Sequence, residues 1–218
     1  PEGTQNVDLT SKIQLYQQVS GSVEMNLSHP RALRDFNGWY HWVIAIDTTQ
    51  ATDSNRVKIY INGELLSGYS TATYPAQNAD ILFNGSSVVQ EIGRTNGNDY
   101  LKGSMSHFHF VDGTAYQAST FGETDSTTGI WKPKTAPSVT YGNNGFFLKF
   151  ENSGSMGTDS SGNGNNFTVN GSMTQLIDTP SNVFATMNAL NSNPNITYTQ
   201  GNNTVNADSG GFLRTAVS

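Results

Sequence analysis

Two runs of alternating sequence, Trp39–Asp47 and Arg56–Ile61, constrain the fold of this chain most strongly. The first carries bulky apolar side chains at both odd and even positions, which is typical of a central strand covered on both faces. The second leads into Asn62-Gly63 and then Glu64-Leu65-Leu66. Asn-Gly between alternating runs indicates a β-hairpin, because a type I′ turn needs positive φ at both central residues. The sequence therefore predicts a central strand at Trp39–Asp47 and a β-hairpin across Arg56–Leu66.

The rest of the chain is consistent with an all-β fold. Only 13% of its 218 residues are charged, against about 25% in an average globular protein, and turn-forming residues such as Asn, Ser and Gly take their place. Many short strands separated by such turns predict a β-sandwich. We expect further strands at Lys12–Tyr16, Ser22–Leu27, Ile81–Phe83, Val88–Ile92, Met105–Val111, Gly145–Phe150 and Phe167–Val169. The predicted core between two sheets contains Trp39, Trp42, Val43, Ile44, Val57, Ile59, Phe108, Phe110, Phe147 and Phe150.

Composition also narrows the function classes. The net charge is −6 and the densest basic stretch is Lys132–Lys134, so we expect no nucleic-acid partner. No apolar run approaches the roughly 20 residues of a membrane span, so we expect no membrane insertion. The chain has no cysteine, which excludes disulfides and thiolate metal sites.

The chain is expected to divide near its C-terminus. Residues 1–173 are predicted to form the sandwich, and 174–190 a connector. After Leu190 the sequence becomes rich in Asn and Ser, so 191–218 is interpreted as the start of a further β module or an extended tail.

The stretches Gly38–Val43, Ala45–Gln50 and Asn55–Gly63 resemble the central strand and hairpin of the laminin-G and concanavalin A-like sandwich superfamily. That resemblance implies a jelly-roll sandwich over roughly residues 10–190. Such domains usually have strands upstream of Lys12–Tyr16, which we expect to be absent here, leaving an edge for another chain to cover. Residues Asn195–Ser218 resemble the entry to a SPRY-like module, so we expect a fragment of a longer polypeptide.

A further set of motifs resembles one bacteriophage branch of this superfamily, the lectin-like domains of tail-fibre and other virion proteins. These motifs are Phe121–Asp125, Gly129–Pro133, Gly145–Phe150, Gly157–Asn165 and Asp178–Asn188. The resemblance implies a location on the virion surface, other virion proteins as partners, and a homo-oligomer that would be a trimer in a fibre. A host cell-surface glycan is the implied ligand.

Glycanases of this fold carry two carboxylates on one strand face in the pattern E-x-D-x-x-E. The nearest match begins at Glu123 and Asp125 but ends in Thr128, and glycines at 122 and 129 indicate a loop. No serine has the flanking glycines of a nucleophile elbow. We therefore predict no catalytic residue.

Two loops carry candidate ligand groups. A sugar site needs a flat aromatic ring and polar side chains for the hydroxyls, which the loop with Arg94, Asn96, Asn98, Asp99 and Tyr100 supplies. The loop with Asp159, Ser161, Asn163 and Asn165 places side-chain oxygens at alternate positions, as a calcium loop does. A single carboxylate makes a weak calcium site, and Asx-turns at a glycine-rich corner are the favoured alternative.

These observations lead to one expectation and two alternatives. We expect a non-catalytic adhesion or structural domain of a virion, in a tail fibre or other surface fibre, that needs no cofactor and binds a host glycan or another virion protein. The alternatives are a capsid decoration or spacer protein without a ligand, and a polysaccharide depolymerase.

Overall fold

The protein is described by a computed structural model that covers residues 3–8, 13–35, 38–83, 85, 88–95, 99–177, 179–180, 196–199 and 204–207. Its contacts group the chain into two compact units. Unit 1 comprises Pro1–Phe36, Tyr40–Gly103 and Phe110–Gly145, and unit 2 comprises Asn37–Trp39, Ser104–His109 and Phe146–Ser218. The boundary expected after residue 173 therefore falls inside unit 2.

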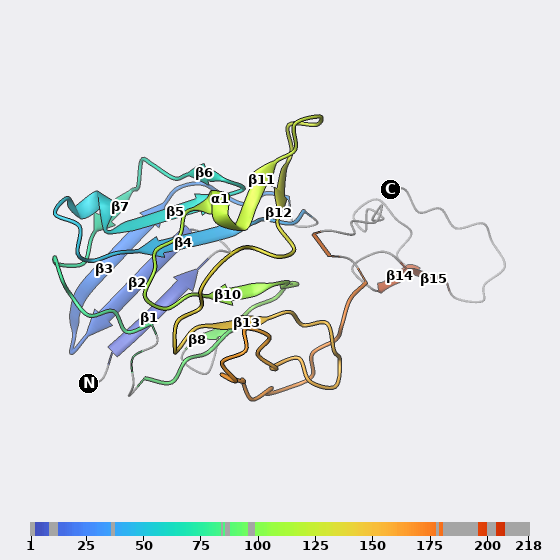
Figure 1. The fold of residues 1–218 in the computed structure, drawn as a ribbon. Coiled ribbons are helices and arrows are strands. Elements are labelled where there is room, and N and C mark those ends of the chain that lie inside the picture. The colour runs from blue at the N-terminus through green and yellow to red at the C-terminus, as the bar shows by residue number, and fades with distance from the viewer. Residues whose placement is uncertain are drawn as a thin grey trace. The chain divides into compact units, whose positions relative to one another are not determined.

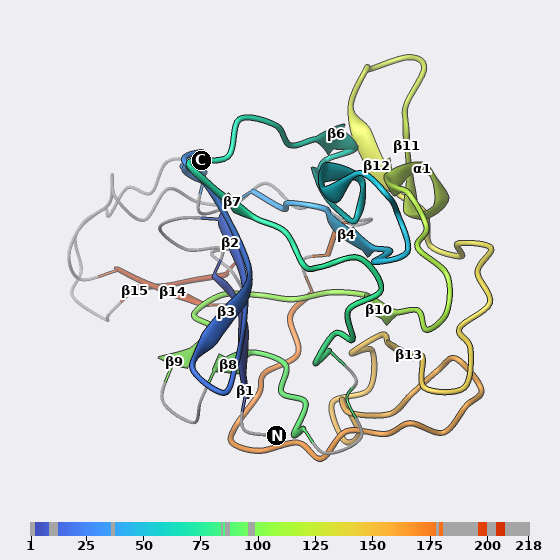
Figure 2. The same ribbon diagram turned by 90° about the vertical axis from the view of Figure 1, so that its left-hand side faces the viewer.

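Unit 1 is built on two antiparallel sheets that form separate layers (Figures 1 and 2). The first sheet has the order β1-β2-β3-β7, with strands at Gly3–Asp8, Ile13–Val19, Ser22–His29 and Thr71–Thr73. The second has the order β4-β5-β6, with strands at Trp42–Ile46, Val57–Ile61 and Glu64–Leu65. A 3-10 turn, η1 (Asp53–Asn55), precedes β5.

Alternation along the strands places one apolar face of each sheet in a shared core. This core contains Ile13, Leu15, Met25, Leu27, Val57, Ile59, Ile61 and Leu66, and Trp42, Ile44 and Ile46 of β4 pack against it. A fully buried side chain of this kind contributes about 1.5–3 kcal/mol relative to an exposed one. The predicted all-β sandwich is confirmed.

The Asn62-Gly63 hairpin also forms as predicted. Asn62 and Gly63 have φ values of 48° and 81°, as a type I′ turn requires. Asn62 extends the pairing by two further bonds: its N–H donates to the carbonyl of His41, and its Oδ1 accepts the His41 N–H, both at 2.8 Å. The turn therefore fixes the register of β4 against β5.

The opposite face of the second sheet is covered as well. Val43 and Tyr60, which face each other in the β4–β5 register, form a second cluster with Ala118. Phe121 and Trp131 pack against this cluster from α1 (Ala118–Phe121) and from the hairpin of β11 (Gly122–Thr124) and β12 (Trp131–Pro133). The expectation of a strand covered on both faces is thus confirmed for β4.

Three smaller pairs complete the strands. In unit 1, β8 (Arg94–Thr95) pairs with β9 (Asp99–Tyr100). β10 (Phe108–Phe110), of which Phe108 and His109 belong to unit 2, pairs with β13 (Phe146–Leu148). In unit 2, β14 (Ile196–Thr199) pairs with β15 (Thr204–Ala207). The last hairpin lies in the region interpreted as a further module or tail, while residues 181–195 lie outside the described part of the chain.

One expectation about strand position was wrong at the N-terminal side. Residues 3–8 form β1, which pairs with β2 from Gly3↔Val19 to Asp8↔Gln14. The edge beside Lys12–Tyr16 is therefore covered by the chain itself. The sequence offered no alternation there because Val7 is the single apolar residue of the strand, and backbone pairing needs none.

Three expected strands do not form. At Ile81–Phe83 the buried Gln17 side chain accepts the Leu82 N–H at 2.9 Å, which takes the place of a strand partner. At Val88–Ile92 the Gln90 amide donates to the carbonyls of Leu82 and Val88, and Val89 is 82% exposed. Phe167–Val169 has one backbone bond, from Phe167 N–H to the Gly157 carbonyl, and no ladder.

The predicted core is confirmed in part. Val43, Val57, Ile59 and Phe147 are buried, and the other six residues are half-buried. They do not share one interior: Val57 and Ile59 lie between the sheets of unit 1, Val43 lies on the outer face of the second sheet, and Phe147 belongs to unit 2.

Candidate functional site

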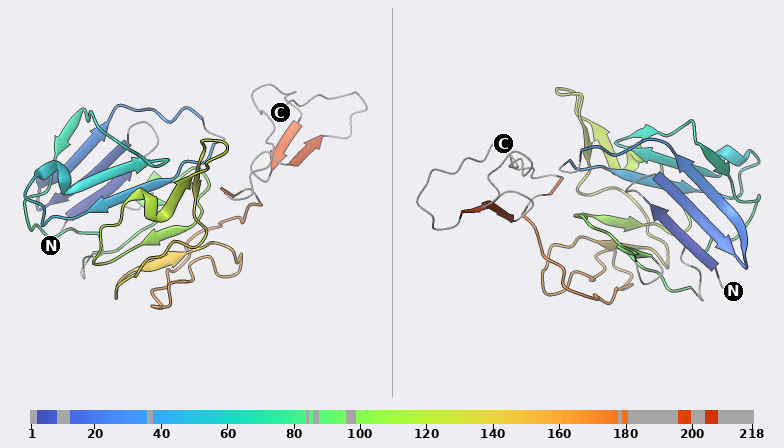
Figure 3. Two further views of the ribbon diagram at one scale, coloured as in Figure 1. Left: turned by 45° about the horizontal axis from the view of Figure 1, so that its top comes forward. Right: turned by 180° about the vertical axis from the view of Figure 1, so that it is seen from behind.

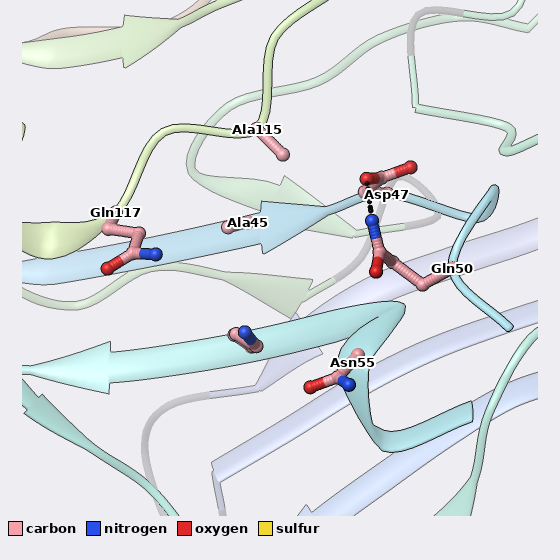
Figure 4. A pocket seen from close by; sticks show the side chains of 7 residues that line it. Ala45, Asp47, Gln50, Asn55, Ala115 and Gln117 are labelled. Carbon is pink, nitrogen blue, oxygen red and sulfur yellow. Dashed lines mark hydrogen bonds between the residues drawn. The ribbon is translucent and has the colours of Figure 1, made fainter. Parts of the chain in front are cut away.

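A hollow opens on the outer face of the second sheet, next to the part that α1 covers (Figure 4). Along this face of β4, Val43 is followed by Ala45 and Asp47, and Ala45 lies opposite Lys58 of β5. The α1 cluster covers Val43 and its partner Tyr60. The next residue on this face is Ala45, whose side chain is only a methyl group. The surface is therefore lower at Ala45 than at the covered Val43, and Ala45 forms the floor of the hollow. The full lining is Ala45, Asp47, Gln50, Asn55, Lys58, Ala115 and Gln117, all in unit 1.

One wall of the hollow is the loop between β4 and β5. Arg56 fixes this loop by hydrogen bonds. Its guanidinium donates to the carbonyls of Gln50 and Ala51 in the loop and to the carbonyl of Pro75, at 2.8–2.9 Å. Gln77 and Asn78 add bonds to the carbonyls of Thr49 and Thr48. The wall is therefore fixed before any ligand arrives.

Asp47 is the acidic group of the hollow. Its Oδ1 accepts the hydroxyl of Thr49 at 2.6 Å and the Thr49 N–H at 3.1 Å, and its Oδ2 accepts the Gln50 amide at 2.6 Å (Figure 4). These hydrogen bonds from Thr49 and Gln50 lower the pKa of the Asp47 carboxyl. Asp47 is thus a charged acceptor at neutral pH, with the Gln50 amide held beside it.

Three other polar side chains line the hollow without a partner. In the described part of the chain, no hydrogen bond or ion pair engages the side chains of Asn55, Lys58 or Gln117. Two primary amides and one ammonium supply both donors and acceptors. With Asp47 and Gln50, they form a concave polar surface suited to a ligand with several hydroxyl groups.

The predicted sugar loop is brought together only in part. Arg94 and Tyr100 are directly opposed in the β8–β9 register, and Tyr100 is 64% exposed. Arg94 forms an ion pair with Glu91, and its hydrogen bonds to Glu91 and Tyr100 raise the pKa of the guanidinium. Asn96 and Asn98 lie outside the described residues, and for Asp99 only the backbone is described.

The predicted calcium loop uses its carboxylate internally. Oδ1 of Asp159 accepts the N–H groups of Phe147 and Ser161, and Oδ2 accepts the Ser161 hydroxyl and the Asn165 N–H, all at 2.8–3.0 Å. Asn163 donates its N–H to the Ser161 hydroxyl. This is the Asx-turn arrangement, in which four donors occupy both carboxylate oxygens.

The described residues contain no group of three or more His, Asp or Glu side chains placed to hold a metal ion.

Glu123 and Asp125 lie on the hairpin that projects from unit 1 in Figure 3. Asp125 accepts the N–H groups of Thr127 and Thr128 and forms an ion pair with Lys132. The bond from Lys132 is the largest cause that lowers the pKa of Asp125. This carboxylate closes the hairpin turn, and Glu123 is exposed across from Lys132.

The four histidines have structural contacts. His41 accepts the indole N–H of Trp131 at 3.0 Å, and His29 contacts the Ser67 carbonyl and the Tyr69 ring. In unit 2, His109 stacks on Phe147 with 4.0 Å between ring centres, and His107 contacts the same ring.

Comparison with known families agrees with this architecture. Residues 4–119, more than half of the chain, match the family described as the concanavalin A-like lectin/glucanases superfamily. The matched region contains both main sheets of unit 1 except Gly3, and it contains all seven residues that line the hollow. The chain therefore belongs to this superfamily. Comparisons with curated proteins and with solved structures found no match.

Sequence reasoning missed the hollow. The alternation Val43, Ala45, Asp47 was visible and put an acid after a small residue on one strand face. Gln117, however, reaches the site from a segment far along the chain, and no pattern in a single sequence predicts that this segment lies over β4.

None of the helices in the described part of the chain has the length and apolarity of a membrane span.

Proposed function

We propose that this concanavalin A-like domain binds a carbohydrate in the hollow beside β4 and catalyses no reaction on it. The observation that carries the proposal is the convergence of Asp47, Gln50, Asn55 and Gln117 on one concave surface. A sugar hydroxyl both donates and accepts hydrogen bonds, and a carboxylate next to primary amides offers both partners. The fixed loop reduces the entropy that binding must overcome.

A binding role fits the charges better than hydrolysis does. Glycoside hydrolysis uses two carboxyl groups about 5–9.5 Å apart, one of which must hold a proton. The hollow is lined by one carboxylate, and its lowered pKa keeps it ionised near neutral pH. Asp125, in the best sequence match to a glycanase motif, is engaged by Lys132 and the turn.

The wider setting that we propose is a virion surface. The ordered motifs from Phe121 to Asn188 that resemble phage lectin-like domains support it. In that setting the domain would belong to a homo-oligomeric fibre, next to other virion proteins, with the hollow facing a host glycan.

A glycan array tests the proposal, followed by titration of the best ligand against two matched variants. Ala45→Leu places a larger side chain on the floor of the hollow and is expected to weaken binding at least tenfold. Ala72→Leu, on the exposed strand β7, makes the same change elsewhere and is expected to leave affinity unchanged.

The outcomes separate the alternatives. Loss of binding in Tyr100→Ala but not in Ala45→Leu would move the site to the β8–β9 hairpin. No binding to any glycan would favour a spacer or decoration role. Release of reducing sugar from a polysaccharide would favour a depolymerase.

A further inference from the structure

We infer that the hollow selects an acidic sugar, with a carboxylate in place of the terminal hydroxymethyl group, and that Lys58 binds this carboxylate. The inference rests on the proposed function, since it names the ligand class of the same site. It starts from the charge of Lys58, which no other group in the described chain neutralises by contact.

Lys58 is one of three described cations without an ion pair or a carbonyl partner, and of these three it is the one that lines the hollow. Acidic residues outnumber basic ones by 17 to 11, so a lysine has many carboxylates available. Even so, the described residues place no carboxylate within 4.0 Å of its ammonium. Most other described cations have an ion pair or carbonyl partner: Arg31, Arg56, Arg94, Lys132, Lys134 and Lys149. Arg34 and Lys102 have no such bond but do not line the hollow.

The neighbouring carboxylate does not take the role of partner. Asp47 lies on the same face of the sheet, two residues beyond Ala45, but its oxygens accept hydrogen bonds from Thr49 and Gln50. The hollow therefore offers an anionic acceptor at one end and an unpaired cation on its floor strand. A uronic acid matches both, with hydroxyl groups toward Asp47 and the carboxylate toward Lys58.

Discrimination against the neutral sugar follows from desolvation. A ligand that fills the hollow removes water from the Lys58 ammonium, which is costly unless an anion replaces that water. A uronate supplies a charge-assisted hydrogen bond, whereas a neutral hydroxymethyl group supplies a weaker one. We therefore expect a preference of roughly tenfold for the acidic sugar, falling with rising salt.

Matched sugar pairs test the inference: glucose with glucuronate, galactose with galacturonate, and mannose with mannuronate. Each pair differs only in the oxidation state of the terminal carbon. Binding is measured by titration of the ¹⁵N-labelled full chain, read from the amide signals of Ala45, Asn55 and Gln117. The variants are Lys58→Gln and, as a matched control, Lys102→Gln, whose side chain is exposed outside the hollow.

For at least one pair, the uronate should bind roughly tenfold more tightly in the wild type and in Lys102→Gln, and the preference should vanish in Lys58→Gln. Equal affinity within every pair would overturn the inference and leave the proposed function standing. A preference that survives in Lys58→Gln would overturn the role of Lys58. If neither member of any pair shifts these signals, both the inference and the hollow as a sugar site fail.

Discussion

The indole Nε1 of Trp131 donates a hydrogen bond of 3.0 Å to Nδ1 of His41. Since Nδ1 is the acceptor, His41 is neutral and carries its proton on Nε2. The bond joins β12 to the residue just before β4, where Asn62 also holds the His41 backbone. The bond therefore connects the β11–β12 hairpin, which covers the second sheet, to His41, whose backbone is paired with Asn62 of the β5–β6 turn.

This bond predicts a pH-dependent stability. Burial lowers the pKa of His41 in the folded protein below its usual 6.5. Above that value the stability is fully present, and it is lost as the pH falls through 6.5 toward the folded pKa, because the unfolded chain binds a proton that the folded protein resists. The free energy of unfolding, measured by urea denaturation from pH 8 to 5, should fall over this range.

The variant His41→Gln serves as the control. It keeps a side-chain acceptor for Trp131 but does not titrate, so the stability advantage of the wild type over the variant should shrink as the pH falls. An advantage that stays constant from pH 8 to 5 would contradict the assigned protonation state.

Two glycines make room for the same indole ring. A Cβ atom added at either Gly63 or Gly122 would lie 2.4 Å from carbon atoms of Trp131. Gly122 has an extended φ of −156°, so Gly122→Ala introduces only the clash. We expect it to destabilise the protein by about 1–3 kcal/mol, measured by chemical denaturation.

Gly63→Ala should cost more, because Gly63 also has a φ of +81°. The matched control is Gly68→Ala: Gly68 has a φ of +78° and open space around the added methyl group, so it isolates the backbone cost of about 1 kcal/mol. Equal losses for Gly63→Ala and Gly68→Ala would mean that the ring does not need the glycine.

The sequence was informative where alternation and turn chemistry agree. The β5–β6 hairpin follows from the alternation of Arg56–Ile61 and from Asn62-Gly63, because only a few residue types adopt the positive φ that this turn requires. Val88–Ile92 was misread because its apolar residues resemble a strand, while the Gln90 side chain takes backbone carbonyls that a ladder would need. Such competition comes from a side chain only two and eight residues away, and it does not alter the apolar pattern of the segment.

The same limit applies to the candidate site. Arg94 and Tyr100 could be grouped from the sequence because they belong to one short loop, and the structure opposes them in the β8–β9 pair. The hollow depends on Ala115 and Gln117 lying over β4 and on Arg56 bonding to the distant Pro75 carbonyl. These are contacts between segments far apart in the chain, and composition and periodicity carry no information about them.

Arg56 is expected to stabilise the fold and to position the wall of the hollow. Arg56→Met keeps the apolar stem and leaves the carbonyls of Gln50, Ala51 and Pro75 without their donor. We expect a loss of about 1–3 kcal/mol in the free energy of unfolding and weaker binding of any ligand of the hollow. Arg56→Lys, which retains the charge but not the fork of donors, should recover only part of both. A stable variant with unchanged affinity would show that the wall does not depend on Arg56.

Asp159 leads to a prediction for unit 2. Burial acts to raise the pKa of Asp159, but hydrogen bonds from Phe147, Ser161 and Asn165 outweigh it and the pKa is lowered. The stabilisation that the ionised Asp159 gives the folded protein is therefore present above pH 3.8 and is lost as the pH falls through the folded pKa.

Asp159→Ala leaves these donors without an acceptor, at a cost of about 1–3 kcal/mol in the free energy of unfolding. Hydrogen exchange at the Phe147 and Asn165 amides should report this loss. Ser161→Ala is the control, because it removes the hydroxyl bond to Asp159 and the acceptor of the Asn163 N–H but leaves the three backbone donors to Asp159 in place.

Calcium distinguishes the Asx-turn from an ion site at the same loop. Both carboxylate oxygens of Asp159 already accept two hydrogen bonds, so an ion would have to displace donors from the turn. We expect exchange at the Phe147 and Asn165 amides to be the same in millimolar calcium and in chelator. Slower exchange in calcium, lost in Asp159→Ala, would instead make Asp159, Ser161, Asn163 and Asn165 a metal site.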